Sequence, residues 1–565
     1  MRATCAMAGP TYTATPPGVR DEKAPRDAVA HGAFWGRDAR GGIRTHDLLL
    51  RRQALYPAEL RTQNSGTTRG VAGTAPEPLS LTAGCDGHKE PPVPIHTMIF
   101  RRLYHDRLAQ ASYILACETT RQAIVVDPLR DPEPYLEAAA LDDVQIAFVT
   151  ETHLHADFLS GAEALAARAG AALYLSAEGE DAGVGARLHR TGATALRAGD
   201  MIAVGRVRLD VRHTPGHTPE HLVFIVTDEA TSPLPVGMLS GDFLFAGDVG
   251  RPDLLERAVG VRDSMHRSAA QLFHSLQTVR ALPDYLQVWP GHGAGSACGK
   301  ALGAVPQTTL GYELRSNWAF QVADEDVFVR DVLADQPDPP AYFALMKALN
   351  ARGVPPMPSR ARMDEATLCV AVREGAVVVD TRPPAEFLAE HLEEAINIPL
   401  GRSFLTWAGS VLDPEREIVL LMSSAERRLA DEAIHDLALI GFDRVLGAMV
   451  ATDLSDLAPR DLSSIPVVAA ADIGAAPNAT IIDVRSEAEW NEGHIPGARH
   501  FPLTQLAARA EELRALQPIV VHCQGGARSS IAVSVLRAFG IHDVTNADGG
   551  YAAWERSHGP AGSTG

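Results

Sequence analysis

The chain contains little cysteine: its 565 residues include only six, at Cys5, Cys85, Cys117, Cys298, Cys369 and Cys523. So few thiols do not make the disulfide framework of small secreted domains. The sequence also lacks a run of about eighteen apolar residues, so we expect no transmembrane helix and no membrane partner. No apolar segment typical of a signal peptide follows Met1. These features predict a cytoplasmic protein with reduced thiols.

Positive charge is scarce in most of the chain. The formal net charge is −19; residues 1–97 hold 12 Lys+Arg against 9 Asp+Glu, or +3, which leaves −22 on the remainder. A surface this acidic repels nucleic-acid phosphates and anionic lipids. We therefore expect a small-molecule substrate and no nucleic-acid partner.

Residues 1–97 also lack a sustained helical or strand period. They are rich in Gly, Pro, Thr, Ala and Arg, a composition that predicts disorder. The folded part is expected to begin at Met98. Residues 1–97 are therefore interpreted as a disordered segment or an extension upstream of the true start.

From Met98 onward, short apolar runs alternate with helical stretches, which predicts an α/β fold. Strands are expected at residues 123–127, 144–150, 207–211, 222–227 and 286–289, and a helix at 162–169. A Pro-rich connector follows residue 330. We place the first domain, with this connector, at residues 98–355.

Two similar segments occupy the C-terminal part. The first contains Val377-Val-Val-Asp-Thr-Arg382 and the second Ile481-Ile-Asp-Val-Arg485, each followed by further strand and helix patterns. Two copies of one parallel α/β domain are therefore predicted, at residues 360–458 and 465–560.

Four polar motifs follow predicted strands of the first domain. They are Thr152-His-Leu-His-Ala-Asp157, His213-Thr-Pro-Gly-His217, Ser240-Gly-Asp242 and Pro290-Gly-His292. Catalytic groups of α/β folds gather at the carboxyl ends of strands. Imidazoles with carboxylates suit Zn, Mn or non-haem Fe. Any one of these histidines is explained as well by a capping or core role, but four such motifs in order favour a metal site.

The order of these motifs resembles the metallo-β-lactamase superfamily, whose fold is an αββα sandwich. Residues 241–253 and 290–300 are similar to the persulfide dioxygenase branch, in its bacterial fusions to rhodanese. The resemblance implies that His153, His217 and Asp242 form a facial triad for one Fe(II) per chain. It places His155 in the second shell, and Asp157 and His292 on the substrate side as catalytic residues.

Phe158 favours one metal over two. Dinuclear members of this superfamily, such as glyoxalase II-type hydrolases, carry a histidine at this position. Phenylalanine has no lone pair, so a second metal would lack a ligand here. A facial triad leaves open positions for a thiolate-type substrate and O2.

Three further residues are placed on the substrate side by the same resemblance. Arg251 and Asp253 would bind substrate, with the arginine pairing to a carboxylate of a thiol such as glutathione. A structural Arg–Asp pair that holds the loop is an equally good interpretation. Cys298 is either a small buried apolar residue or a substrate-binding thiol.

The second C-terminal copy carries a reactive cysteine motif, His522-Cys523-Gln-Gly-Gly-Ala-Arg-Ser529. Gly525 and Gly526 let backbone N–H groups converge into an anion nest beside a helix N-terminus, where a thiolate or persulfide is stabilised. Arg528 would assist the anion. The motif resembles the active rhodanese domain, a sulfurtransferase. In the first copy Met422 replaces the cysteine and the glycines are missing, so we predict that this copy is inactive.

The combined resemblance implies oxidation of a small-thiol persulfide by O2 to sulfite, with Cys523 forming or using thiosulfate. We also expect a homo-oligomer. Two alternatives stay open. One is a Zn-dependent thioester hydrolase at the same site; the other is a non-enzymatic sulfur carrier or sensor that needs only Cys523.

The proposed start at Met98 is directly testable. The intact mass of the protein isolated from its native host should correspond to a chain that begins at Met98. A mass matching all 565 residues would contradict this expectation.

Overall fold

The computed structural model describes residues 97–179, 182–300, 302–359, 363–451, 454, 461–475 and 478–559. The prediction of disorder before Met98 falls outside these residues. None of the described helices is long and apolar enough to cross a membrane.

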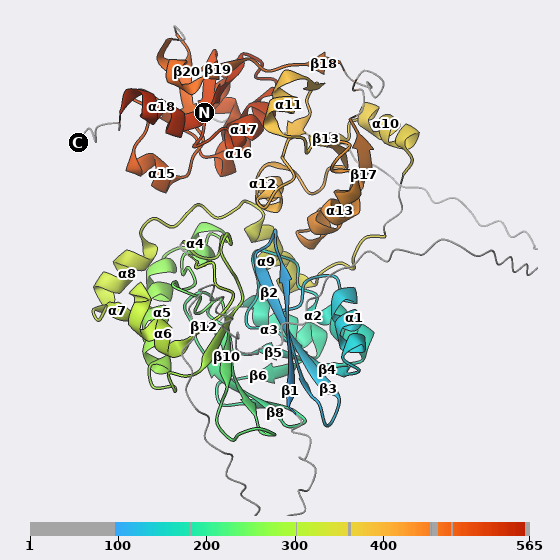
Figure 1. The fold of residues 1–565 in the computed structure, drawn as a ribbon, viewed down its shortest axis with the longest axis vertical. Coiled ribbons are helices and arrows are strands. Elements are labelled where there is room, and N and C mark those ends of the chain that lie inside the picture. Colours follow the sequence, from blue (N-terminus) through green and yellow to red (C-terminus); the bar gives the residue numbers. More distant parts are fainter. Residues whose placement is uncertain are drawn as a thin grey trace, which may run out of the picture. The chain divides into compact units, whose positions relative to one another are not determined.

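The first domain contains two six-stranded sheets (Figure 1). The first sheet has the order β1 (Met98–His105), β2 (Gln110–Cys117), β3 (Gln122–Val126), β4 (Gln145–Thr150), β5 (Ala172–Ser176) and β6 (Thr194–Leu196). The second runs from β12 (Thr308–Thr309) through β11 (Gln287–Pro290), β10 (Gly237–Gly241), β9 (Leu222–Asp228) and β8 (Val207–His213) to β7 (Met201–Val204).

Helices cover the outer face of each sheet. The first sheet is accompanied by α1 (Glu133–Leu141), α2 (Ala162–Ala169) and α3 (Ala182–Thr191). The second is accompanied by α4 (Leu254–Arg257), α5 (Met265–Val279), α6 (Leu310–Ser316), α7 (Trp318–Gln321) and α8 (Glu325–Leu333). The predicted helix at 162–169 and all five predicted strands are confirmed, with ends that differ by one or two residues.

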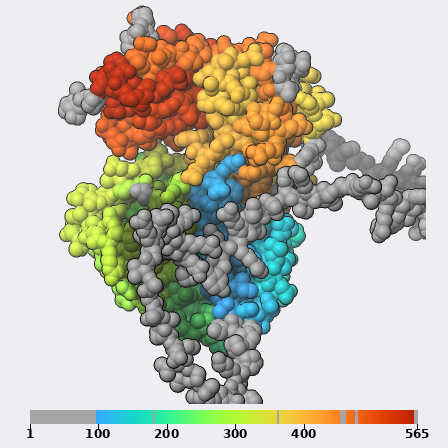
Figure 2. Space-filling view, in the orientation of Figure 1, coloured from blue at the N-terminus to red at the C-terminus, as the bar shows by residue number. Residues whose placement is uncertain are grey.

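Apolar side chains divide this domain into layers. Leu115 and Val126 of the first sheet pack with Leu209 and Phe224 of the second in one buried cluster between the sheets. Separate clusters bury α1 and α2 against the first sheet and α5 and α8 against the second. This arrangement is the predicted αββα sandwich. β1, coloured blue, is partly exposed on the face shown in the space-filling view (Figure 2).

The connector after residue 330 is more ordered than its proline content suggests. It contains α9 (Phe343–Arg352), which the sequence pattern did not predict. Phe343, Met346 and Asn350 of this helix are buried. Its apolar residues belong to the same cluster as those of the first C-terminal copy, so tertiary packing holds the helix.

The two C-terminal copies are parallel α/β domains, as predicted. The first contains α10 (Glu365–Arg373), β13 (Val377–Asp380), α11 (Pro384–Ala389), β14 (His391–Leu392), β15 (Ile396–Asn397), α12 (Phe404–Val411), β16 (Ile418–Met422), α13 (Ala430–Leu439) and β17 (Val445–Val450). Its four-stranded parallel sheet has the order β15-β13-β16-β17.

The second copy repeats this plan. It contains β18 (Leu462–Ser463), β19 (Val467–Ala469), β20 (Thr480–Asp483), α15 (Glu487–Glu492), β21 (Arg499–His500), α16 (Leu503–Arg514), β22 (Ile519–His522), α17 (Ala527–Ala538), β23 (Val544–Asp548) and α18 (Gly550–His558). Its five-stranded parallel sheet has the order β19-β23-β22-β20-β21.

A shared ion pair confirms that the copies are related. Arg382 forks onto Asp380 and donates to the carbonyl of Glu390 at 2.9 Å. Arg485 forks onto Asp483 and donates to the carbonyl of Gly493 at 2.7 Å. Both aspartates end the first long strand of their sheet, so the pair fixes the same turn in each copy.

Buried polar contacts join the first copy to the loops that follow β3 and β4 of the first domain. Arg130 is 1% exposed; it pairs with Asp443 and donates to the carbonyls of Ala438 at 2.6 Å and Pro356 at 2.9 Å. The N–H of Leu159 donates to the carbonyl of Leu439 at 2.9 Å. These bonds continue the packing of the first domain into the first copy.

We predict that Arg130→Ala destabilises the protein by about 3 kcal/mol, because it leaves buried acceptors without a donor. Thermal unfolding followed by circular dichroism should show a clearly lower midpoint. Arg168→Ala is the matched control, since its pair with Glu133 is solvent-exposed and is worth less than about 1 kcal/mol. Equal midpoints for the two variants would contradict the prediction.

Candidate metal centre and sulfur-transfer site

The four predicted motifs meet at one end of the two sheets. They follow β4, β8, β10 and β11, and they bring ligand atoms of His153, His217 and Asp242 within 4.8 Å of one another. All three side chains are buried. Gly291 permits this approach, because a Cβ there would lie 2.6 Å from Asp242 Oδ1. The expected donor group of two imidazoles and one carboxylate is therefore assembled.

Hydrogen bonds orient the two imidazoles of this group. His217 Nδ1 donates to the carbonyl of Arg251 at 3.0 Å, and its Nε2 lies 3.6 Å from Asp242 Oδ2. His153 Nδ1 lies 2.9 Å from the hydroxyl of Thr152. In each ring, Nδ1 makes the orienting hydrogen bond and Nε2 is left to bind a metal. This is the usual arrangement of a metal-binding histidine.

The electrostatics of the group suit a cation. Neither carboxylate oxygen of Asp242 accepts a hydrogen bond from the described residues. Burial by itself would raise the pKa of Asp242, but the charges of His292 and His217 lower it. Burial and neighbouring histidines hold the pKa of His153 well below its usual value. Neutral imidazoles beside an ionised carboxylate form a donor set that fits a divalent metal.

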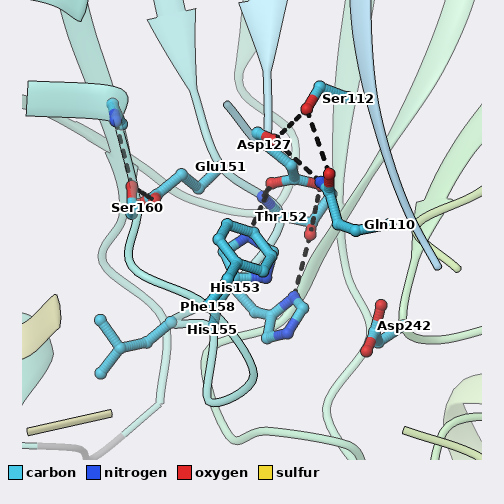
Figure 3. Close-up of polar contacts among 12 residues, drawn as sticks. Gln110, Ser112, Asp127, Glu151, Thr152, His153, His155, Phe158, Ser160 and Asp242 are labelled. Atoms are coloured by element: carbon cyan, nitrogen blue, oxygen red, sulfur yellow. Dashed lines mark hydrogen bonds and ion pairs between the residues drawn. The ribbon is translucent and has the colours of Figure 1, made fainter. Parts of the chain in front are cut away.

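Asp127 organises the loop that carries His153 and His155 (Figure 3). Its Oδ1 accepts from the Thr152 N–H at 2.6 Å and lies 3.2 Å from His155 Nε2, and its Oδ2 accepts from the Thr152 hydroxyl at 2.9 Å. Against the effect of burial, Asp127 raises the pKa of His155 to about 9. His155 thus pairs with Asp127 and does not belong to the His153–His217–Asp242 group. The position of Asp127 at the end of a strand was the only sequence signal of this role.

His221 is a second residue that the sequence interpretation missed. Its Nε2 accepts from the Asp242 N–H at 3.1 Å, so Nδ1 carries the proton and donates to the Thr214 hydroxyl at 3.0 Å. Burial and the charge of His217 keep its pKa well below the ordinary value. Its position four residues after the motif that ends at His217 is the signal that was available.

Asp157, His292 and Cys298 form a neighbouring group. Their ligand atoms also lie within 4.8 Å of one another. His292 Nε2 lies 3.2 Å from Asp157 Oδ2 and 3.4 Å from Asp242 Oδ2. Burial and the nearby Asp157 carboxylate raise the pKa of the Cys298 thiol to about 12. Phe158 has no exposed surface and packs against the His155 ring, with centroids 4.3 Å apart.

Helix α9 contacts the loop between His155 and Ser160. Asn350 is fully buried; its Nδ2 donates to the carbonyls of His155 at 2.9 Å and Phe158 at 2.8 Å, while its Oδ1 accepts from the Ser160 N–H at 2.9 Å. Tyr342, just before α9, is buried, and burial together with the Asp157 carboxylate raises its pKa well above the usual value. These residues come from the connector and were not predicted.

Arg251 and Asp253 correspond to the structural alternative rather than to substrate binding. Arg251 has no exposed surface, and its Nε and Nη2 donate to both oxygens of Asp253 at 2.8 and 2.7 Å. It also donates to the carbonyls of Ala297 and Pro337. The burial and the internal hydrogen bonds of this guanidinium favour the structural interpretation of the pair.

Cys523 lies between β22 and α17, as the motif predicts. The Gly526 N–H donates to its Sγ at 3.1 Å, and Gly526 adopts a φ of 113° that favours glycine. The thiol lies 3.7 Å from the Ser529 hydroxyl. Gly525 lies in the same loop, where a Cβ would meet no atom within 4 Å. The helix begins at Ala527.

Arg528 is held away from a direct contact with the cysteine. Its Nη1 and Nη2 donate to both oxygens of Glu489 at 2.6 Å. The sequence repeat contained this glutamate but did not reveal the pair. Arg528 therefore contributes positive potential to the loop while Glu489 fixes its position.

The corresponding loop of the first copy is differently built. Met422 has no exposed surface, and the following Ser423 N–H donates to Glu426 Oε2 at 3.1 Å. Thr381 donates to the same oxygen at 3.2 Å. The Glu426 carboxylate thus occupies the Ser423 N–H, which would otherwise face a bound anion. The thioether of Met422 stands where the second copy has the nucleophilic cysteine.

Comparison with protein families agrees with this organisation. The model described as metallo-beta-lactamase superfamily matches residues 105–292, and the model described as rhodanese-like domain matches residues 370–446 and 468–557. A solved metallo-beta-lactamase structure from Staphylococcus aureus subsp. aureus COL is 40% identical. It matches over 62% of this chain and 99% of its own, with a TM-score of 0.57.

Curated relatives of the first domain have two different activities in their names. Human mitochondrial persulfide dioxygenase ETHE1 is 26% identical over 198 residues, which are 34% of this chain and 68% of that protein. The hydroxyacylglutathione hydrolase of Polaromonas sp. is 34% identical over 184 residues, which are 32% of this chain and 61% of that protein. The chain therefore spans less than two thirds of the hydrolase.

The Glu489–Arg528 pair predicts a pH dependence of stability. Burial opposes ionisation, but the pair lowers the pKa of Glu489 from its ordinary 4.5 to about 2. A lowered carboxyl pKa stabilises the fold above pH 4.5, and this contribution is lost as the pH falls towards 2. Glu489→Gln should therefore lower the thermal midpoint at pH 7 and differ progressively less below pH 4.5.

Thermal unfolding of wild type and variant across this pH range measures the effect. Glu137→Gln, at an exposed position of α1, serves as the control and should show no such convergence. A difference for Glu489→Gln that is independent of pH would contradict the lowered pKa.

Proposed function

Because the chain belongs to the metallo-β-lactamase superfamily and carries rhodanese-like domains, we propose that it is a persulfide dioxygenase with sulfurtransferase activity. One thiol persulfide, one O2 and one water give one thiol, one sulfite and two protons. A second persulfide then passes its outer sulfur through Cys523 to sulfite, which gives thiosulfate, or the transfer runs in reverse. The substrate is a small thiol persulfide of the glutathione type.

The observation that carries the proposal is the group of His153, His217 and Asp242. Two imidazoles and one carboxylate, whose oxygens accept no hydrogen bond from described residues, suit a single non-haem iron. Fe(II) held there would supply open positions at which a persulfide sulfur and O2 react. Human persulfide dioxygenase ETHE1 is a relative of this domain.

The neighbouring side chains supply the polar part of the proposed reaction. His292 Nε2 lies between Asp157 Oδ2 and Asp242 Oδ2, so it can hold a proton and donate it to a departing thiolate. Cys298 lies in the same buried group and forms part of the surface that a persulfide would contact. Phe158 and Tyr342 exclude water from this side.

The proposed sulfur transfer depends on Cys523. Attack by its thiolate on the outer sulfur of a persulfide breaks the S–S bond and releases the donor thiol, which takes up a proton. The N–H of Gly526 and the N-terminus of α17 stabilise the resulting cysteine persulfide anion. Sulfite then removes that sulfur and regenerates the thiolate. Met422 and Glu426 support the proposal that the first copy does not take part.

A thioester hydrolase is the second candidate. It is favoured by the relative named hydroxyacylglutathione hydrolase, and the same histidines would hold zinc. A sulfur carrier or sensor that uses only Cys523 is the third. Phe158 weighs against the hydrolase, because it removes a ligand used by its dinuclear members.

We predict that full-length protein purified without oxygen contains one iron per chain and consumes O2 when given glutathione persulfide. Asp242→Ala should lower this rate by at least about 100-fold, since even indirect disturbance of metal ligands costs about 10–100-fold. Cys523→Ser should leave O2 consumption largely intact and abolish thiosulfate formation. An oxygen electrode, iron analysis and thiosulfate assay on one sample provide the measurements.

The alternatives give different results in the same experiment. Two zinc ions per chain, thioester hydrolysis and no O2 consumption would establish the hydrolase instead. Loss of every activity in Cys523→Ser would favour the carrier.

A further inference from the structure

Helix α12 packs the first copy against the buried centre of the first domain. Phe404 and Leu405, at the start of this helix, have no exposed surface. They belong to the same apolar cluster as Cys298 and Tyr342. A Cβ at Gly409 would lie only 2.2 Å from Cδ1 of Tyr342, so the helix and this ring are in close contact. The segment just before α12 is therefore held beside the proposed substrate side.

Arg402 lies in that segment, next to the loop that joins His292 to Cys298. A Cβ at Gly295, in the middle of the loop, would lie 3.6 Å from Cδ of Arg402 and 4.0 Å from its Nη1. His292 and Cys298 are each 2% exposed, whereas Gly295 and Arg402 are exposed. The loop thus leads from the buried centre to the surface, and Arg402 lies where the loop reaches the surface.

The guanidinium of Arg402 has no acidic partner. Within the part of the chain that the structure describes, it makes no hydrogen bond and no ion pair. Arg251 and Arg528, the arginines closest in sequence to the proposed reactive groups, are instead bound to carboxylates of the protein. An unpaired guanidinium presents a planar fork of N–H donors that matches a carboxylate.

We propose that Arg402 binds a carboxylate of the persulfide substrate and so makes the dioxygenase selective for acidic thiols. The inference rests on the proposed persulfide dioxygenase function. The contact is a charge-assisted hydrogen bond from the guanidinium to the carboxylate, and no atom or electron is transferred. The first copy, which has methionine in place of the nucleophilic cysteine, thereby contributes a residue to the substrate site of the neighbouring domain.

The dimensions of the loop agree with this role. Gly295 follows His292 by three residues, so their Cα atoms are at most about 11 Å apart. A tripeptide thiol such as glutathione has about the same extended length, on the order of 10 Å. A persulfide whose sulfur lies beside His292 can therefore extend a carboxylate to Arg402.

Oxygen consumption by iron-loaded full-length protein tests the assignment with two substrates. Glutathione persulfide carries carboxylates, whereas mercaptoethanol persulfide carries none. Arg402→Ala and Arg402→Glu should raise the KM for glutathione persulfide at least about tenfold, because a charge-assisted hydrogen bond is lost. The kcat should stay within about twofold, since this bond is made equally before and during the reaction. The KM for mercaptoethanol persulfide should not change, and Arg402→Lys should retain part of the affinity for glutathione persulfide.

Arg373→Ala is the matched control. Arg373 is an exposed arginine of the same copy and ends α10 before β13 begins, so it lies at the amino ends of the parallel strands. Arg402 follows the carboxyl end of β15, at the opposite edge. Arg373→Ala should leave both KM values unchanged. An unchanged KM for glutathione persulfide in Arg402→Ala, or an equal rise for both persulfides, would overturn the proposal.

Binding measured without O2 separates this inference from the proposed function. Isothermal titration calorimetry of anaerobic, iron-loaded protein with glutathione should show at least about tenfold weaker binding in Arg402→Ala than in wild type. Glutathione binding that depends on Arg402 in a protein that never consumes O2 would overturn the dioxygenase and leave the carboxylate site. Oxygen consumption with a KM that does not depend on Arg402 would overturn this inference alone.

Discussion

One buried amide side chain holds together the part of the molecule on which the proposed chemistry depends. Asn350 satisfies two carbonyls and one N–H of the loop between His155 and Ser160. This loop runs without regular structure through a water-excluded interior, where each unpaired backbone group costs about 1–3 kcal/mol. Because Asn350 belongs to α9, the shape of the metal-binding loop depends on a helix outside the sandwich.

The second constraint is electrostatic. Five buried histidines and three buried aspartates lie close together at this end of the sheets: His153, His155, His217, His221, His292, Asp127, Asp157 and Asp242. Burial disfavours charge on every one of them. Hydrogen bonds fix the orientation of three of these histidines. Asp127 pairs with His155, and the carbonyls of Arg251 and Ala109 orient His217 and His292.

The sequence predicted those parts of the site that depend on local order. His153, His217, Asp242 and His292 each follow a strand, and strand ends of the two sheets necessarily meet, so their proximity could be inferred. Asp127, Asn350 and Tyr342 could not be identified, because their roles arise from contacts across long stretches of chain. His221 was overlooked although it lies only four residues after the motif that ends at His217.

Local motifs were also ambiguous where burial decides whether a side chain can contact a substrate. Arg251 and Asp253 are two residues apart, and that spacing is equally compatible with a substrate contact and an internal fork. Only the complete burial of the guanidinium and its bonds to Ala297 and Pro337 distinguish them. In the same way, the proximity of Cys298 to Asp157 and His292 could not be inferred from the sequence.

The backbone bond from Leu159 to Leu439 has an evolutionary consequence. A module with methionine in place of the nucleophilic cysteine would, by itself, be free to diverge or to be deleted. Here the first copy completes the hydrogen bonding of the loop next to the metal centre, so its inheritance is tied to that of its neighbour. Mutational tolerance in this copy should therefore be lowest around α13 and highest in the loop that follows Met422.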